Sequence, residues 1–123
     1  MVVYLTHQND TAVATLKPTA ENNNIVKALK KIAETKWVGN ITHDSLDKCL
    51  VAINTYSGIN SGWYNPVAVK INGLTGIYMV NQSGNLHFES RIIKQDNDKF
   101  LIEYLSDSGY NQFESIYREI ANN

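Results

Sequence analysis

The chain has 123 residues, a formal net charge of −1 and a hydrophobic fraction of 43%. This length and composition predict one domain, residues 1–123, with enough apolar side chains for a core, and they exclude the intrinsically disordered class. The near-neutral charge excludes the general excess of Lys and Arg that attracts a protein to nucleic acid backbones.

The N-terminal half predicts two short strands and two helices. "VVYLT" and "AVATLK" flank the polar stretch "HQND", which is typical of a hairpin or of two strands joined by a loop. Apolar residues at helical spacing then predict a helix over about 21–36, with Gly39-Asn40 as its stop. A second helix comes next, and Asp44 or Ser45 is expected to cap its N-terminus.

From residue 67 on, the hydrophobic pattern repeats every two residues, which predicts an antiparallel meander with short turns. The four predicted strands are 67–71, 74–80, 86–94 and 99–106. Asn72-Gly73 favours a type I′ turn with positive φ at both residues, and such a turn places Ile71 opposite Leu74. Because side chains of a strand alternate between the two faces, one face of the sheet then carries Val69, Ile71, Leu74, Tyr78 and Val80.

The C-terminal segment predicts a helix, for which Ser106, Asp107 or Ser108 is a suitable N-cap. Its apolar stripe consists of Tyr110, Phe113, Tyr117 and Ile120. The strand 74–80 is apolar on both faces, so we expect helices to cover much of the sheet. The predicted fold class is α+β: an antiparallel sheet, made of a four-strand C-terminal meander plus short N-terminal strands, packed with two or three helices.

The order of strand, two helices, antiparallel sheet and helix resembles the coarse element order of RelE-like ribonuclease toxins. The resemblance extends to element order alone, because those toxins are usually strongly basic and no motif of theirs matches this chain residue by residue. The resemblance implies metal-independent RNA cleavage as an alternative activity for this chain.

One stretch, "HFESR", carries residue types suited to that chemistry. Residues i, i+2 and i+4 of a strand share a face, so we expect His87, Glu89 and Arg91 to be neighbours. In cleavage by a 2′-hydroxyl nucleophile, Glu89 would take the proton, His87 would protonate the leaving oxygen and Arg91 would stabilise the phosphorane charge. The structural interpretation of the same stripe is a charged, solvated strand face that pairs with Lys70 or Glu103 on a neighbouring strand.

A second feature indicates binding rather than catalysis. The polar loop "NTYSGINSGWYNP" carries Tyr56, Trp63 and Tyr64, and Tyr and Trp are frequent anchors of protein interfaces. With Glu114 and Glu119 of the C-terminal helix they form the predicted contact set. We therefore expect a small protein-binding domain that occludes a partner, such as an inhibitor, an immunity protein, an antitoxin or a phage or plasmid accessory factor, with the ribonuclease as the alternative.

The remaining chemistry gives few candidates. His7, His43 and His87 lack metal-ligand spacing, and the glycines form no nucleotide-binding motif, so no metal or cofactor is expected. Cys49 is predicted to be a buried thiol, and the N-terminus has no signal-peptide pattern, which favours the cytoplasm and no membrane span. A third hypothesis is a small-ligand or RNA-binding sheet face on which Tyr78 or Tyr104 stacks a base.

Overall fold

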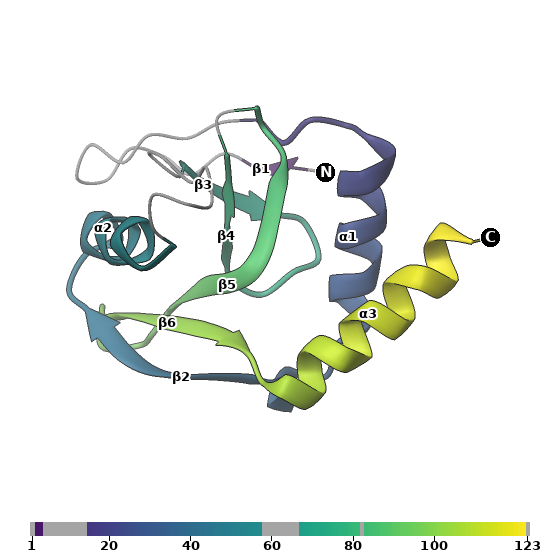
Figure 1. The fold of residues 1–123 in the computed structure, drawn as a ribbon. Coiled ribbons are helices and arrows are strands. Elements are labelled where there is room, and N and C mark those ends of the chain that lie inside the picture. The colour runs from purple at the N-terminus through teal and green to yellow at the C-terminus, as the bar shows by residue number, and fades with distance from the viewer. Residues whose placement is uncertain (1, 4–14, 58–66, 82, 123) are drawn as a thin grey trace.

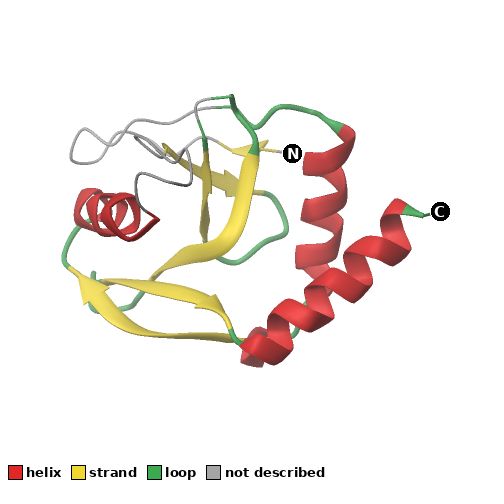
Figure 2. Cartoon of the chain, in the orientation of Figure 1, coloured by secondary structure: helices red, strands yellow, loops and turns green. Residues whose placement is uncertain are grey.

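A computed structural model of the chain describes residues 2–3, 15–57, 67–81 and 83–122. Six strands form one antiparallel sheet in the order β1-β3-β4-β5-β6-β2, and three α-helices pack on it (Figures 1 and 2). The strands are β1 (Val2–Val3), β2 (Trp37–His43), β3 (Val67–Ile71), β4 (Ile77–Val80), β5 (Leu86–Lys94) and β6 (Phe100–Leu105). The helices are α1 (Ala20–Lys31), α2 (Leu46–Ser57) and α3 (Asp107–Ala121), with a short 3-10 turn, η1 (Glu34–Lys36), before β2. The α+β prediction is confirmed.

The sheet separates two apolar cores. Helices α1 and α3 lie together on one side of the sheet and α2 lies on the other, as Figure 1 shows. Every residue of β4 is buried, with Tyr78 and Val80 in the core under α1 and Ile77 and Met79 in the core beside α2. Both apolar faces of this strand are thus buried, in agreement with the prediction that helices cover much of the sheet.

The first helix is shorter than predicted. Its N-cap is Thr19, whose hydroxyl accepts a hydrogen bond from the Asn22 N–H, and it ends at Lys31 because the next residue, Ile32, is extended. The prediction of a helix to residue 36 is therefore wrong for 32–36, and the prediction that Gly39-Asn40 stops this helix is wrong as well.

Residues 37–43 form strand β2, which pairs antiparallel with β6, and Gly39-Asn40 lies at a β-bulge of this pair rather than at a helix end. A Cβ at Gly39 would lie 2.1 Å from the carbonyl oxygen of Ile102. Glycine is thus required here by the close approach of two backbones. The buried ring of Trp37, at the first position of β2, lies in the core under α1.

The caps of the other two helices are as expected. Ser45 accepts a hydrogen bond from the Lys48 N–H at the start of α2, and Ser106 accepts one from the Gly109 N–H at the start of α3. Phe113 of the predicted apolar stripe is buried and stacks on Phe88 with ring centroids 4.1 Å apart.

The turn between β3 and β4 is not the predicted type I′ turn. Gly73 has a positive φ of 87°, whereas Asn72 does not have one, and the Leu74 N–H donates to the Ile71 carbonyl oxygen. This is the pattern of a type II turn. Val69 consequently pairs with Tyr78, two residues away from the expected register. An even offset leaves the faces unchanged, so the predicted common face is confirmed although the predicted pairing of Ile71 with Leu74 is wrong.

At the N-terminus, β1 pairs antiparallel with β3, which confirms a short strand within "VVYLT". The other predicted strand lies largely outside the described residues, and its described part, residues 15–17, is not in a strand. Leu16 of this part is buried in the core under α1. Among the described helices, none has the length and apolar character needed to cross a lipid bilayer.

Candidate functional site

The long strand β5 changes face in its middle. In its first half His87 pairs with Met79 of β4, and in its second half Ile92 pairs with Ile77. Five residue steps along β5 thus correspond to two along β4, so the strand carries three additional residues. Because side chains alternate with a period of two, an odd offset reverses the faces of all later residues. His87 therefore faces the α2 side of the sheet, whereas Arg91 faces α1.

The predicted stripe of His87, Glu89 and Arg91 is consequently not one surface, and the expectation that these residues share a face is wrong. Leu86 and Phe88 pack in the core under α1, as a regular strand would place them, but Ile92 belongs to the core beside α2. Glu89 is part of β5, and its side chain lies outside the described part of the structure.

Arg91 is part of a buried ionic cluster. Its side chain is 5% exposed, and its guanidinium lies 3.0 Å from carboxylate oxygens of both Glu34 and Glu103 and 4.3 Å above the ring of Trp37. Burial lowers the pKa of Arg91, but hydrogen bonds to Glu34 and Tyr78 raise it, and the net shift is upward. The predicted pairing with Glu103 is present, but the expectation of a solvated strand face is wrong for Arg91, because its side chain is buried. The ion pairs of Arg91 connect β5 to β6 and to the segment after α1.

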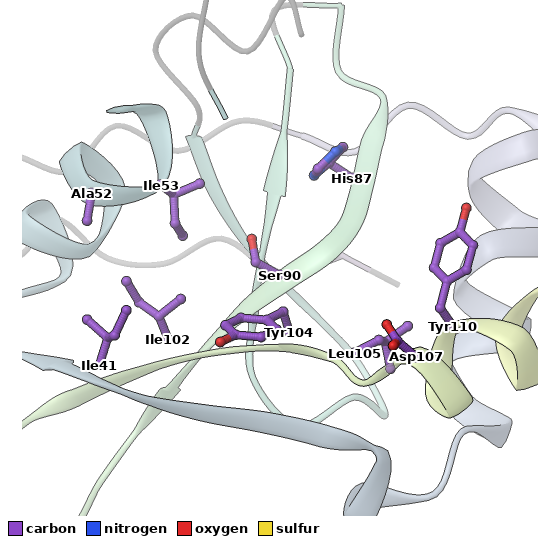
Figure 3. Close-up of a pocket in the computed structure, with 10 residues that line it drawn as sticks. All are labelled: Ile41, Ala52, Ile53, His87, Ser90, Ile102, Tyr104, Leu105, Asp107 and Tyr110. Carbon is purple, nitrogen blue, oxygen red and sulfur yellow. The ribbon is translucent and has the colours of Figure 1, made fainter. Parts of the chain in front are cut away.

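A recess of about 510 Å³ opens on the α2 side of the sheet and is bordered by α2, β2, β5, β6 and the start of α3 (Figure 3). Its floor includes Ile53 of α2 and Ile102 of β6, which are both buried. Its border includes Ile41, Tyr104 and Tyr110, which are 41%, 47% and 41% exposed. These are three of the five large hydrophobic residues that the described residues expose. Exposed apolar surface is thus concentrated at this one hollow.

A few polar groups lie among these apolar side chains. His87 and Ser90 project from β5 on one side of the recess, and Asp107 and Tyr110 project from α3 on the other (Figure 3). Tyr104 of β6, which pairs with Ser90 in the sheet, lies below Ser90 in the same view. An apolar hollow of this volume with a small number of polar groups is typical of sites that accept a ligand or an anchoring side chain.

The predicted contact set is only partly described. Trp63 and Tyr64 lie outside the described residues, and Tyr56 lies in α2 with its side chain outside them. On α3, Glu114 forms an ion pair of 3.1 Å with Arg118, and Glu119 is exposed. The two glutamates are not among the residues that line the recess.

Three border residues of the recess were not in the predicted contact set. Ile41 lies in a strand that the sequence did not indicate, although the β-branched residues of "WVGNITH" were a usable signal. Tyr110 was assigned to the core stripe of its helix, and Tyr104 was considered only as a base-stacking residue. Tyr78, the other tyrosine of that hypothesis, is 1% exposed in the core and has no surface on which a base could stack.

The other reactive side chains are buried or dispersed. Cys49 is fully buried, as predicted, and burial raises the pKa of its thiol to about 11. Within the described residues, no group of three His, Cys, Asp or Glu side chains is arranged to hold a metal ion. Comparisons with protein-family models, with curated proteins and with solved structures gave no match. The function therefore has to be argued from the recess itself.

Proposed function

We propose that the chain is a small protein-binding domain that acts by occluding a partner, and that the recess receives an anchoring side chain of that partner. The observation that carries the proposal is the grouping of Ile41, Tyr104 and Tyr110 around a hollow with a buried apolar floor. Scattered exposed hydrophobic residues are ordinary, but a group of them at one concave site is typical of an interface.

The energetics of protein interfaces support this use of the recess. Interface hot spots are enriched in tyrosine and lie in pockets from which the partner displaces water. A tyrosine offers a large apolar area together with one hydroxyl, so Tyr104 and Tyr110 suit both apolar and hydrogen-bonding contacts. His87, Ser90 and Asp107 supply the few polar groups that would fix the orientation of the inserted side chain.

The ribonuclease alternative keeps less support. It needs a base, an acid and a cation around one phosphate, and the change of face in β5 separates His87 from Arg91. The positive charge of Arg91 is also already balanced by the carboxylates of Glu34 and Glu103. His87 remains accessible to the recess as a candidate acid, and it keeps this alternative open to a cleavage assay with a His87→Ala variant.

The test is capture of partners from lysate of the native host by the tagged chain and by matched variants. We expect one stoichiometric protein that is lost with Tyr104→Ala and with Ile41→Asp and retained with Val51→Asp. Val51 is 66% exposed on α2 and is not among the residues that line the recess, so it controls for a new charge on the surface.

Quantitatively, loss of a hot spot costs about 2 kcal/mol of binding free energy, which corresponds to about a 30-fold weaker affinity. Purified partner titrated with each variant measures this difference, and circular dichroism shows whether each variant is folded. Occlusion is tested by whether the bound chain blocks the activity of the partner. A partner retained equally by all three variants, or recovery of RNA without protein, would overturn the proposal.

A further inference from the structure

A second cleft, which we call the lysine cleft, lies on the same face of the sheet as the recess. Its volume is about 530 Å³, and it is formed where β3, β4, β5 and β6 approach the start of α2. Its apolar side chains include Leu46, Ile77, Ile92 and Phe100, which are all at most 9% exposed. Its charged side chains are Lys70 and Lys94, which are exposed.

The pairing register explains why two lysines border an apolar floor. Lys70 of β3 pairs with Ile77 of β4, which pairs with Ile92 of β5, so these three side chains share one face. Lys94 lies two residues beyond Ile92 and therefore projects from that face as well. Lysine stems commonly lie along apolar surface with the ammonium group in water, and we expect this of Lys70 and Lys94, which line the cleft and are exposed.

The charges of the two clefts are of opposite kind. No acidic residue is among the described residues that line the lysine cleft, so neither ammonium group has a carboxylate on that wall. The lining of the recess contains Asp107 and neither Lys nor Arg. The lysine cleft therefore favours an occupant that carries a negative charge at one end and apolar groups elsewhere.

Nucleic acid fits this cleft less well than a small amphiphile does. Stacking of bases needs an accessible aromatic face, and Phe100, the aromatic residue among the described lining, is 9% exposed. The whole chain also has a net charge of −1, which opposes a long polyanion. A single anionic head needs only the local pair of lysines, and an apolar body covers the half-buried side chains of Leu74 and Ile93, which also line the cleft.

We propose that the lysine cleft binds a small apolar carboxylate, of the class of medium-chain fatty acids, with its carboxylate between Lys70 and Lys94 and its chain along the half-buried side chains of Leu74 and Ile93. The volume of the cleft lies within the range of about 300 to 1,000 Å³ that is typical of small-molecule sites. This proposal is independent of the protein-binding function, because the two clefts share no residue among those described.

The experiment is titration of the full chain with decanoate below its micelle concentration, monitored by amide NMR and by calorimetry. We expect saturable binding of one decanoate, with shifts concentrated at the amides of Ile77, Ile92 and Lys94. Decanol, which has the same chain without the charge, should bind at least 10-fold more weakly. Binding should also weaken as salt is raised, because both ammonium groups are exposed.

Three variants separate the charge effect from general loss of structure. Lys70→Gln and Lys94→Gln should each weaken decanoate binding at least about 5-fold, whereas Lys27→Gln, at an exposed position of α1, should leave it unchanged. All three replaced residues are exposed, so the variants should fold as the parent chain does. Absence of saturable binding, equal binding of decanol, or shifts located at the recess instead would each overturn the proposal. Partner capture by the lysine variants reports separately on the protein-binding function.

Discussion

The buried cluster around Arg91 predicts a strong difference between two glutamates that contact the same guanidinium. Both carboxylates lie 3.0 Å from it, but the side chain of Glu103 is 15% exposed and that of Glu34 is 62% exposed. Glu103→Gln keeps an acceptor but removes the charge that compensates Arg91 where water is largely excluded. We expect this change to lower the free energy of unfolding by about 2 kcal/mol. Glu34→Gln removes a pair that water already screens, at a cost of about 0.5 kcal/mol.

Urea unfolding monitored by far-ultraviolet circular dichroism measures both variants. With a denaturant slope of about 2 kcal/mol per molar urea, the midpoint should fall by about 1 M for Glu103→Gln and by about 0.3 M for Glu34→Gln. The slope itself should be unchanged, which shows that compactness is not altered. Equal midpoints for the two variants, or a larger effect of Glu34→Gln, would refute the inference that the less exposed carboxylate stabilises Arg91 more.

Three further predictions concern the fold. Gly39→Ala should lower the free energy of unfolding by about 3 kcal/mol, because the new Cβ would meet the backbone of Ile102. Gly73→Ala should lower it by about 1 kcal/mol, because there the new Cβ meets only the flexible end of a lysine side chain. Equal melting temperatures for the two variants would contradict this. Ser106→Ala should cost about 1 kcal/mol through loss of the cap of α3, and an unchanged midpoint in urea would show that the cap is dispensable. Burial raises the pKa of Cys49 in the folded chain to about 11 from an ordinary value of 9.0, so the folded state holds its proton more tightly. The contribution of Cys49 to the free energy of unfolding is therefore fully present below pH 9 and is lost as the pH rises toward 11. In a Cys49→Ala variant, the free energy of unfolding should fall less steeply over that interval.

Features with a local cause were predicted well from the sequence. Strands β3 to β6 arise from the period-two pattern, and Ser45 and Ser106 act as caps because their hydroxyls lie beside the first N–H groups of a helix. The turn after β3 was assigned to the wrong type, yet the faces of Val69 and Tyr78 were right. An error of two residues in register preserves which side of a sheet each residue occupies.

Features with a distant cause were missed. Strand β2 exists because Trp37 pairs with Leu105, far along the chain, and local propensity does not report such a partner. The offset in β5 arises between two neighbouring strands, so the alternation of "HFESR" gave no sign that His87 and Arg91 would separate. The recess could not be predicted for the same reason. Its border forms only when five elements pack together, namely β2, β5, β6, α2 and α3.

The faces of β5 on either side of its three additional residues are set by two pairs, His87 with Met79 and Ile92 with Ile77. If one residue between His87 and Ile92 were deleted and both pairs were kept, the two residues would lie four steps apart, and regular alternation would leave Ile92 beside α2 and Arg91 beside Glu34. Deletion of two residues would leave an odd offset and keep both side chains on their present sides. Changes in length at this point thus preserve the faces as long as both pairs form, so functional variants of this chain should preserve the two pairs more strictly than the number of residues between them.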